Sequence, residues 1–331
     1  MSSESNEQIL AVYQESRIPV FVMQAPHIER LRRELPHYNI IWCRSQEEFL
    51  SALPRADTVL TLRFKQEWFS LAPRLRRIGT PAAGRDFFSI TAKPSHVSIK
   101  NGTFHGAIMA ESALGMILAF NRGILTAYKH QLAGDLWPNQ QLFGSRLIDG
   151  THAVILGFGH IGVHIGERLK AFGVRITGIK RELSDAVPAW FDDGDTVLPV
   201  ERLHDALADA DHVVAVLPSD TGTTGLIGRA EFEIMPRHAV FYNLGRGNCV
   251  DETALADALR GGVIAGACLD VFAQEPLCAD SPLADGSLPG LLRMPHATAF
   301  CECYLDRYLD EFITWIKSDF NYENDRTSLL C

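Results

Sequence analysis

The stretch AVILGFGHIG, residues 153–162, decides how the fold of this chain is read. Its apolar start is typical of a short buried strand, and it runs directly into three glycines at Gly157, Gly159 and Gly162. The residues that follow, VHIGERLKAFG, have the pattern of a helix. A strand, a glycine-rich turn and a helix in this order predict a βαβ unit whose helix N-terminus binds the phosphates of a dinucleotide.

Each glycine of this turn has its own expected role. Gly157 permits the tight turn, Gly159 lets a pyrophosphate approach the backbone, and Gly162 lets the helix pack closely on the strand. A glycine-rich turn that binds no ligand is the weaker alternative, because the flanking strand and helix fit the motif. The residues expected to contact the cofactor here are Gly157, Gly159, His160, Ile161 and Gly162.

Strand-like runs follow the glycine motif at regular intervals. They lie at 174–180, 212–218, 239–245 and 265–271, and helical segments separate them. This alternation predicts a doubly wound parallel sheet of the α/β class.

A second α/β domain is expected before the motif. The runs at 18–24, 58–64 and 75–80 read as strands, with polar helical stretches between them, and again suggest a parallel sheet. The segment 107–131 reads as one long helix, apolar on more than one face and buried between domains. A last helix over 304–320 has apolar residues at helical spacing and is expected to return to the first domain.

Composition limits the classes of partner. The chain has 331 residues, 47% of them hydrophobic and 21% charged, which is enough for two domains with cores of their own. The formal net charge of -9 gives no support for a nucleic-acid or anionic-membrane partner. A polar start and no apolar run near ~18 residues predict a cytoplasmic protein. Seven cysteines, an odd number, indicate reduced thiols rather than a disulfide framework.

The end of the strand after the glycine motif indicates the kind of dinucleotide. An acid at this place binds the ribose 2′-hydroxyl of NAD, whereas Arg or Lys attracts the 2′-phosphate of NADP. Here the strand ends in Lys180 and Arg181, which favours NADP. NAD stays open, since Glu182 or Asp185 could bind the ribose while the two cations face solvent.

A cation, a carboxylate and an imidazole follow in the last third of the chain. They are Arg246 in NLGRGN, Glu275 in VFAQEP and His296 in MPHATAF. A guanidinium can bind a carboxylate and polarise a neighbouring carbonyl oxygen, and an imidazole can protonate that oxygen. A carboxylate near the imidazole stabilises its charged form. The three predict reduction of a carbonyl group in a small anionic substrate, against the plainer alternative of a structural arginine and a loop glutamate in solvent.

Five motifs, in order and spacing, resemble one family. They are VILGFGHIG, AVLPSDTGTTGLIG, FYNLGRGNCVDETALADAL, AGACLDVFAQEPL and PHATAF. The chain is similar in these to the D-2-hydroxyacid dehydrogenases that act with NAD or NADP, of the glyoxylate/hydroxypyruvate reductase type. The resemblance implies a Rossmann cofactor domain, 111–296, inserted into a discontinuous flavodoxin-like substrate domain, 1–110 and 297–331. It also implies a crossing helix near 107–131 and a homodimer built largely through the cofactor domains.

The resemblance assigns roles to particular residues. Arg246 matches the catalytic arginine, Glu275 the carboxylate that pairs with the imidazole, and His296 the acid/base histidine. Asp270 matches the position that contacts the nicotinamide amide. Further cofactor contacts are expected at strand ends, at Leu217, Pro218, Asn243, Leu244 and Gly245.

The substrate side is matched less closely. Leu62-Arg63 and Ala83-Gly84 occupy loops where the family holds the substrate carboxylate with backbone N–H groups, together with Arg246. Glyoxylate or hydroxypyruvate, reduced with NADPH to the D-2-hydroxy acid, is the expected substrate. The neighbouring residues that depart from the commoner pattern are Phe64, Lys65, Arg85, Phe87 and Phe88.

Two other functions stay open. One is a short-form phosphoglycerate dehydrogenase, and the other is a dinucleotide-sensing protein like the C-terminal-binding-protein corepressors. No metal site is expected, because His160 belongs to the glycine motif and Cys301-Glu302-Cys303 lacks a second ligand pair. The two cysteines are interpreted as free thiols. Trp137 is expected in the core, and the alternative that the resemblance implies is a place near the active site of a partner subunit.

Overall fold

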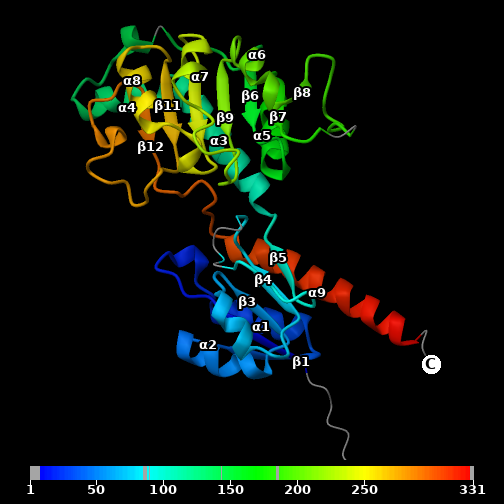
Figure 1. Ribbon diagram of the computed structural model, residues 1–331. Coiled ribbons are helices and arrows are strands. Elements are labelled where there is room, and N and C mark those ends of the chain that lie inside the picture. The colour runs from blue at the N-terminus through cyan, green and yellow to red at the C-terminus, as the bar shows by residue number, and fades with distance from the viewer. Residues whose placement is uncertain (1–7, 85–87, 89, 143, 184–185, 329–331) are drawn as a thin grey trace, which may run out of the picture. The chain divides into compact units, whose positions relative to one another are not determined.

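The computed structural model describes residues 8–84, 88, 90–142, 144–183 and 186–328. The chain divides into two compact units (Figure 1). The larger unit is Gly106–Ala299, and the smaller unit combines Met1–His105 with Phe300–Cys331. The sequence predicts divisions at 110/111 and 296/297, and the roles given to the two domains stay predictions.

The larger unit is built on a sheet of seven parallel strands. Their order is β12-β11-β10-β9-β6-β7-β8, so the chain starts inside the sheet, winds to one edge and then winds to the other. This doubly wound order confirms the predicted fold class, and its switch point lies between β6 and β9. The strands are β6 (His152–Leu156), β7 (Arg175–Lys180), β8 (Thr196–Pro199), β9 (His212–Ala215), β10 (Val240–Asn243), β11 (Gly266–Leu269) and β12 (Leu291–Arg293).

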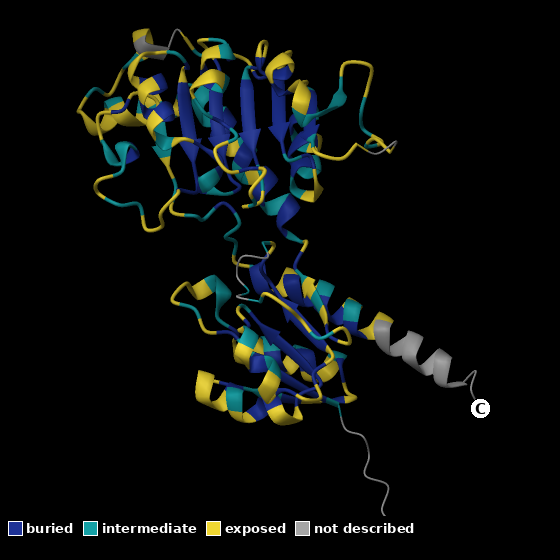
Figure 2. Ribbon diagram, in the orientation of Figure 1, coloured by how far each residue is buried: buried dark blue, intermediate teal, exposed yellow. Residues whose placement is uncertain are grey.

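An apolar core covers each face of this sheet, and the strands between them are buried (Figure 2). Along β6, Val154 and Leu156 belong to one core, and Ala153 and Ile155 to the other. Successive side chains of a strand point to opposite faces of the sheet. When both faces are covered, the sequence of each strand is therefore a continuous apolar run. The helices that supply these cores are α6 (Leu203–Leu207), α7 (Arg229–Ile234) and α8 (Glu252–Arg260) on one side, and α3 (His105–Asn121) and α5 (His160–Lys170) on the other.

The smaller unit has a parallel sheet of five strands in the order β2-β1-β3-β4-β5. This is the flavodoxin-like order, as predicted. Helix α9 packs on it, because Gly79 of β4 leaves a space in which a Cβ would lie 2.5 Å from the Phe312 ring. The elements are β1 (Gln8–Tyr13), α1 (Ala25–Glu34), β2 (Tyr38–Trp42), α2 (Gln46–Ala52), β3 (Thr58–Thr61), β4 (Arg77–Thr80), β5 (Ser98–Asn101) and α9 (Tyr304–Ser328).

The first strand is not where the sequence predicts it. The run 18–24 was expected to be a strand, but Pro19–Phe21 forms a 3-10 turn and the strand is Gln8–Tyr13. Proline has a fixed φ and no N–H, so Pro19 is unsuited to a central parallel strand. β1 occupies such a place, since it pairs with β2 on one side and β3 on the other.

The prediction of a single helix over 107–131 is also wrong. The chain forms α3 (His105–Asn121) and α4 (Ile124–Leu132), bent by 67° at Gly123, whose φ is 66°. α4 is not buried, and Trp137 after it is 81% exposed rather than in the core. Within the described residues, no single helix has the length and apolar character to cross a membrane, although the bent pair α3 and α4 passes that test of length and composition together.

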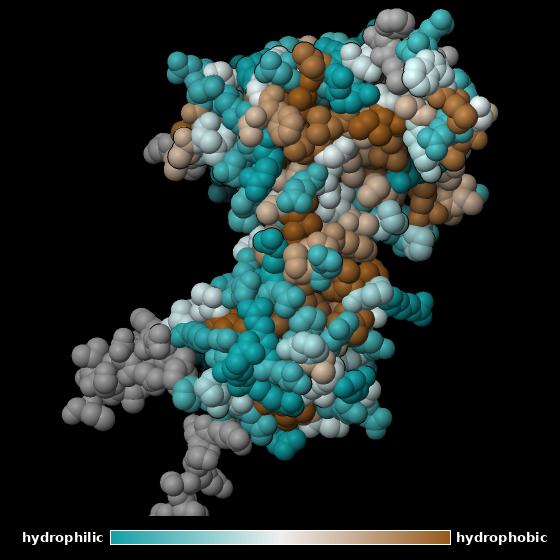
Figure 3. All heavy atoms as spheres, turned by 180° about the vertical axis from the view of Figure 1, so that it is seen from behind, coloured by the Kyte–Doolittle hydropathy of each residue, from teal (hydrophilic) through white to brown (hydrophobic). Residues whose placement is uncertain are grey.

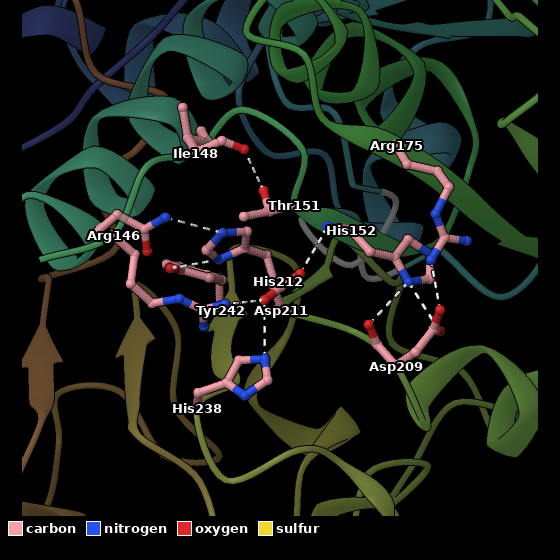
Figure 4. A network of polar contacts seen from close by, with 11 residues as sticks. Arg146, Ile148, Thr151, His152, Arg175, Asp209, Asp211, His212, His238 and Tyr242 are labelled. Carbon is pink, nitrogen blue, oxygen red and sulfur yellow. Dashed lines mark hydrogen bonds and ion pairs between the residues drawn. The ribbon is translucent and has the colours of Figure 1, made fainter. Parts of the chain in front are cut away.

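A polar network closes the amino-terminal edge of the larger sheet (Figure 4). The carboxylate of Asp211 accepts hydrogen bonds from Arg146, from the amide of His152 and from His238, each at 2.9 Å. Burial alone would raise the pKa of Asp211, but these donors and charges more than offset it and hold the pKa below its usual value. His212, buried beside it, has its pKa lowered to about 4 by burial.

Candidate active site

Two glycines form the turn between β6 and α5, and a third, Gly162, lies in the first turn of α5. Gly157 has a φ of 93°, and a Cβ there would lie 2.9 Å from the carbonyl oxygen of Val216. A Cβ on Gly162 would lie 2.4 Å from the carbonyl oxygen of Gly157, so the helix packs directly on the turn. At Gly159, by contrast, no atom of the described residues lies within 4 Å of the Cβ position. Space for a ligand therefore opens at the N-terminus of α5, where free amides attract an anion.

The ring of Phe158 fixes this turn against β7. A Cβ on Gly178 would lie 2.3 Å from that ring, so only glycine at this position of the strand leaves room for the Phe158 side chain. The ring of Phe191 also packs on Phe158, with ring centroids 5.7 Å apart. The position of the glycine turn thus depends on a residue of the next strand.

A cleft of about 560 Å³ opens beside the turn, at the carboxyl ends of β6, β7 and β9. This is the switch point of the sheet, where open α/β folds bind their ligands. Of the residues expected at the cofactor, those that line the cleft are Gly157, Gly159, Lys180, Arg181, Leu217 and Pro218. Lining residues that were not expected include Val200, Asp220, Gly222, Thr223 and Leu226.

The remaining expected cofactor residues lie elsewhere in the larger unit. His160, Ile161 and Gly162 lie in the first turn of α5, and the others stand at or just after the ends of β10 and β11. They are outside the lining of the cleft. The residues of this second group are Asn243, Leu244, Gly245 and Asp270.

Charges of both signs meet at the rim of the cleft. The guanidinium of Arg181 lies 3.5 Å from the carboxylate of Asp220, and the Arg181 side chain is 71% exposed. Lys180 and Glu182 line the same cleft. Asp185, the alternative ribose ligand, lies outside the described residues. The rim therefore offers two cations to an anionic group, with two carboxylates, those of Glu182 and Asp220, beside them.

A buried amide shapes the loop that carries Arg246. The side chain of Asn243, 1% exposed, donates to the carbonyl oxygen of Arg246 at 3.0 Å and accepts from the amide of Gly245 at 3.1 Å. The Arg246 guanidinium donates to the carbonyl oxygen of Gly245 at 2.8 Å and is half-buried. The loop after β10 is thus closed by hydrogen bonds on both sides of Arg246.

Two glycines around Arg246 join this loop to its neighbours. A Cβ on Gly245 would lie 2.5 Å from the backbone nitrogen of Leu217, and one on Gly247 would lie 1.9 Å from the carbonyl carbon of Phe272. No larger residue fits either place. The loops after β9, β10 and β11 are therefore in backbone contact, which connects the wall of the cleft to the segment before Glu275.

Glu275 and His296 form a direct pair. The Nδ1 atom of His296 lies 2.7 Å from one carboxylate oxygen of Glu275, and the other oxygen accepts from the amide of Phe272 at 3.1 Å. Both side chains keep access to solvent, at 42% for His296 and 35% for Glu275. Because Nδ1 faces the carboxylate, Nε2 is the nitrogen left to exchange a proton with a ligand. The alternative of a loop glutamate facing only solvent is wrong.

Asp270, buried at 1% exposure, holds the His296 segment in place. Its carboxylate accepts from the amide of Ala297 at 2.7 Å and from the amide and hydroxyl of Thr298. His296 itself has a φ of 54°, a left-handed conformation that is unfavourable for a side chain of this kind and needs such support. The expected contact of Asp270 with a nicotinamide amide stays a prediction.

The expected substrate loops belong to the smaller unit. Leu62 and Arg63 follow β3, and the side-chain amide of Asn101 donates to the carbonyl oxygens of Ala82 and Gly84 at 3.1 Å each. Ala83 is exposed between them. Of the departures from the family pattern, Phe64 is fully buried against Trp68 and Phe69 and so serves the core. Arg85 and Phe87 lie outside the described residues.

Comparison with known families identifies the protein family to which this chain belongs. The model of the NAD-binding domain of the D-isomer specific 2-hydroxyacid dehydrogenases matches residues 114–298. The chain belongs to this family, and the resemblance of its motifs is thereby confirmed.

Individual relatives cover most of the chain. A glyoxylate reductase of Aeropyrum pernix is 33% identical over 301 residues, which is 85% of this chain and 86% of that protein. The crystal structure of a D-isomer specific 2-hydroxyacid dehydrogenase family protein from Aeromonas salmonicida is 30% identical, has a TM-score of 0.75 and covers 94% of this chain and 96% of its own. A family member from Xanthobacter autotrophicus, in complex with NADPH and MES, is 25% identical with a TM-score of 0.78, over 95% of this chain and 96% of its own.

Other relatives are longer. D-3-phosphoglycerate dehydrogenase of Mycobacterium tuberculosis is 32% identical over 261 residues, 77% of this chain, but the match spans only 47% of that enzyme. The chain thus spans about half the length of these relatives.

Proposed function

We propose that this protein reduces a small 2-oxo acid to the D-2-hydroxy acid, with NADPH as the favoured hydride donor. The observation that carries the proposal is the pair of His296 and Glu275, 2.7 Å apart, in the same unit as the glycine turn and its cleft. A proton donor and a dinucleotide-sized cleft on one sheet are what carbonyl reduction requires.

The residues of the chain supply the proton and the anion site. Nε2 of His296 gives its proton to the carbonyl oxygen, while Nδ1–H stays bonded to Glu275, which remains ionised and stabilises the imidazolium before transfer. Arg246 binds the substrate carboxylate and polarises the carbonyl. A bound nicotinamide dinucleotide supplies the hydride. The backbone N–H groups of Leu62-Arg63 and Ala83-Gly84 are proposed to hold the same carboxylate, as in the family.

The preference for NADPH rests on the rim of the cleft. Lys180 ends β7 and Arg181 follows it, at the place where the 2′ substituent of the adenosine ribose is recognised in this fold. The relative from Xanthobacter autotrophicus was crystallised with NADPH, which agrees with this preference. The test is kcat/KM for NADPH and NADH with one fixed 2-oxo acid, and a clear preference for NADH would overturn the proposal.

Glyoxylate or hydroxypyruvate is the proposed substrate. The glyoxylate reductase of Aeropyrum pernix supports it, as does a glyoxylate/hydroxypyruvate reductase B of Pectobacterium carotovorum, which is 33% identical over 70% of this chain. The phosphoglycerate dehydrogenases favour 3-phosphohydroxypyruvate as the second candidate. A turnover panel of these three acids, each with both cofactors, decides between them. If no 2-oxo acid in the panel turns over, the proposed reductase is wrong and the dinucleotide-sensing function takes its place.

We also propose that two copies of the chain associate through the region around α4. Apolar residues gather on the face of the larger unit seen in Figure 3. A monomer seldom exposes so many large apolar side chains in one stretch, and closed symmetric dimers commonly bury them. The exposed residues of this stretch are Ile124, Tyr128, Leu132, Leu136, Trp137 and Leu147.

The mass in solution tests this dimer. Leu132→Glu places a charge on a side chain that is 71% exposed, and light scattering should then show half the mass of the parent protein. Leu71→Glu, at a 43% exposed site in the smaller unit, is the control and should keep the parent mass. A monomeric parent protein, or a dimer that survives Leu132→Glu, would contradict the proposed interface.

A further inference from the structure

We propose that Cys301 and Cys303 form a peroxide-reactive dithiol that closes to an intramolecular disulfide. Their sulfur atoms lie 3.3 Å apart, and both side chains are partly exposed. The pair belongs to the smaller unit and takes no part in the proposed reduction of a 2-oxo acid. The proposal is therefore independent of that function.

Cys303 is placed to react as a thiolate. It immediately precedes α9, and its carbonyl oxygen accepts from the amide of Arg307 at 3.0 Å, which puts it at the N-terminus of that long helix. Nε of Arg307 also donates to the Cys303 sulfur at 3.4 Å. Hydrogen bonds from Arg307 and then from Cys301 hold the pKa of the Cys303 thiol below its usual value.

Cys301 has the opposite character. Burial, together with the neighbouring sulfur of Cys303, raises the pKa of its thiol to about 11. It therefore stays a thiol and donates its S–H to Cys303. One sulfur is thus suited to attack an oxidant, and the other to resolve the product.

The reaction balances with a hydroperoxide as the oxidant. The Cys303 thiolate attacks the outer peroxide oxygen, the O–O bond breaks, and an alcohol or water leaves with the reduced oxygen. Cys303 is then a sulfenic acid. The Cys301 sulfur attacks the sulfur of that sulfenic acid, the S–S bond forms, and the hydroxyl leaves as water with the proton of Cys301. Two thiols and one hydroperoxide give one disulfide, one alcohol or water, and one further water.

The geometry needs only a small movement for closure. A disulfide has an S–S length of about 2.05 Å, so the two sulfurs must approach by about 1.3 Å from their present 3.3 Å. The buried thiols Cys43, Cys249 and Cys268 lack such access to an oxidant.

Peptide mapping tests the disulfide directly. One tryptic peptide, residues 294–307, contains both cysteines and separates them from the other five. After one equivalent of hydrogen peroxide, this peptide should lose the mass of two hydrogens and regain it on reduction with a thiol. Recovery of the peptide as the free dithiol, with oxidation elsewhere, would overturn the proposal.

Two single variants test the assigned order of attack. Cys301→Ser should leave a sulfenic acid on Cys303 that dimedone traps, whereas Cys303→Ser should leave Cys301 unoxidised under the same conditions. Cys278→Ser, at a partly exposed thiol in a loop of the larger unit, is the control and should form the disulfide like the parent. The reverse trapping pattern would contradict the roles of the two sulfurs.

Alkylation rates test the part played by Arg307. A lower thiol pKa raises the fraction of thiolate, and the accompanying loss of nucleophilicity offsets only part of this gain, so iodoacetamide labels such a thiol faster. In the Cys301→Ser background at pH 7, Cys303 should therefore label faster than Cys278. Arg307→Gln should remove this advantage, and Arg307→Lys should keep part of it. Equal labelling of Cys303 and Cys278 with Arg307 in place would show that Cys303 is not activated.

Discussion

The backbone amide of His296 donates to the carbonyl oxygen of Asp270 at 2.8 Å, so the residue proposed to move the proton is held by the end of a buried strand. The Asp270 side chain then binds the amides of the next two residues, Ala297 and Thr298. Glu275 fixes the ring itself through Nδ1. The main chain and the side chain of His296 are therefore positioned by two different carboxylic residues.

Replacing His296 by Asn should remove the proton donor and leave the cleft unchanged. We expect kcat to fall about 10²–10⁴-fold, the usual contribution of a general acid, with nearly unchanged cofactor affinity. Steady-state kinetics and a fluorescence titration with NADPH measure the two effects. Turnover close to that of the parent would remove His296 from its proposed role.

Glu275→Gln should have a smaller effect of the same kind. The amide keeps the size of the side chain but not the charge that stabilises the imidazolium. We therefore expect kcat to fall about 10- to 100-fold, which is less than the loss expected when the acid itself is removed. The double variant with His296→Asn serves as the control. If the pair acts as one unit, adding Glu275→Gln to His296→Asn should cost little more.

Asp270→Asn should lower both stability and turnover. The amide group would turn an N–H donor toward N–H donors of Ala297 or Thr298 in a fully buried place, at a cost of about 1–3 kcal/mol in the free energy of unfolding. Urea unfolding and kcat measure these two effects. Thr298→Ser keeps the hydroxyl and should behave like the parent. A loss of cofactor affinity alone, with normal stability, would instead favour the nicotinamide contact.

Arg181→Ala should weaken NADPH selectively. A charge-assisted contact with the 2′-phosphate is worth about 1.5–3 kcal/mol, so KM for NADPH should rise about 10- to 100-fold while KM for NADH stays the same. Asp220→Asn should lower KM for NADPH, because it removes the carboxylate that lies 3.5 Å from this guanidinium. Arg202→Ala, an exposed arginine of the same unit paired with Asp205, is the control. An equal loss for both cofactors would contradict the 2′-phosphate contact.

His212 should make the larger unit sensitive to acid. Its pKa is lowered by burial from 6.5 to about 4, so the unfolded chain takes up a proton that the folded chain does not in this window. The stability it contributes is present above pH 6.5 and is lost as pH falls toward 4, by about 3 kcal/mol in total. Urea unfolding between pH 7 and pH 4 measures this loss. His212→Gln should flatten the slope, and an unchanged slope would place the acid sensitivity elsewhere.

Local patterns were enough to predict much of the larger unit. The glycine turn, five of the strands and the doubly wound order follow from apolar runs and glycine spacing, which are properties of neighbouring residues. The pairing of Glu275 with His296 was expected from the motif resemblance, and the structure adds its distance.

The errors arise where distant contacts decide. Gly123 gave no clear signal of a break, since a single glycine is tolerated inside a helix, yet its left-handed φ bends the chain there. Trp137 looked like core because large aromatic residues usually are, but it is 81% exposed in this chain, on the surface through which we propose that two copies associate. Asp220 reaches Arg181 across 39 residues of sequence, and only the fold brings them together.

The close packing of the Phe158 ring on Gly178 makes this glycine important for cofactor binding. Gly178 lies in the neighbouring strand and does not line the cleft, so its distance from a ligand would wrongly suggest that it tolerates substitution. Any side chain there displaces the ring and with it the glycine turn that we propose binds the phosphates. In a saturation screen for cofactor binding, Gly178 should therefore lose function as completely as Gly157, a fourth glycine of the fingerprint that no linear motif records.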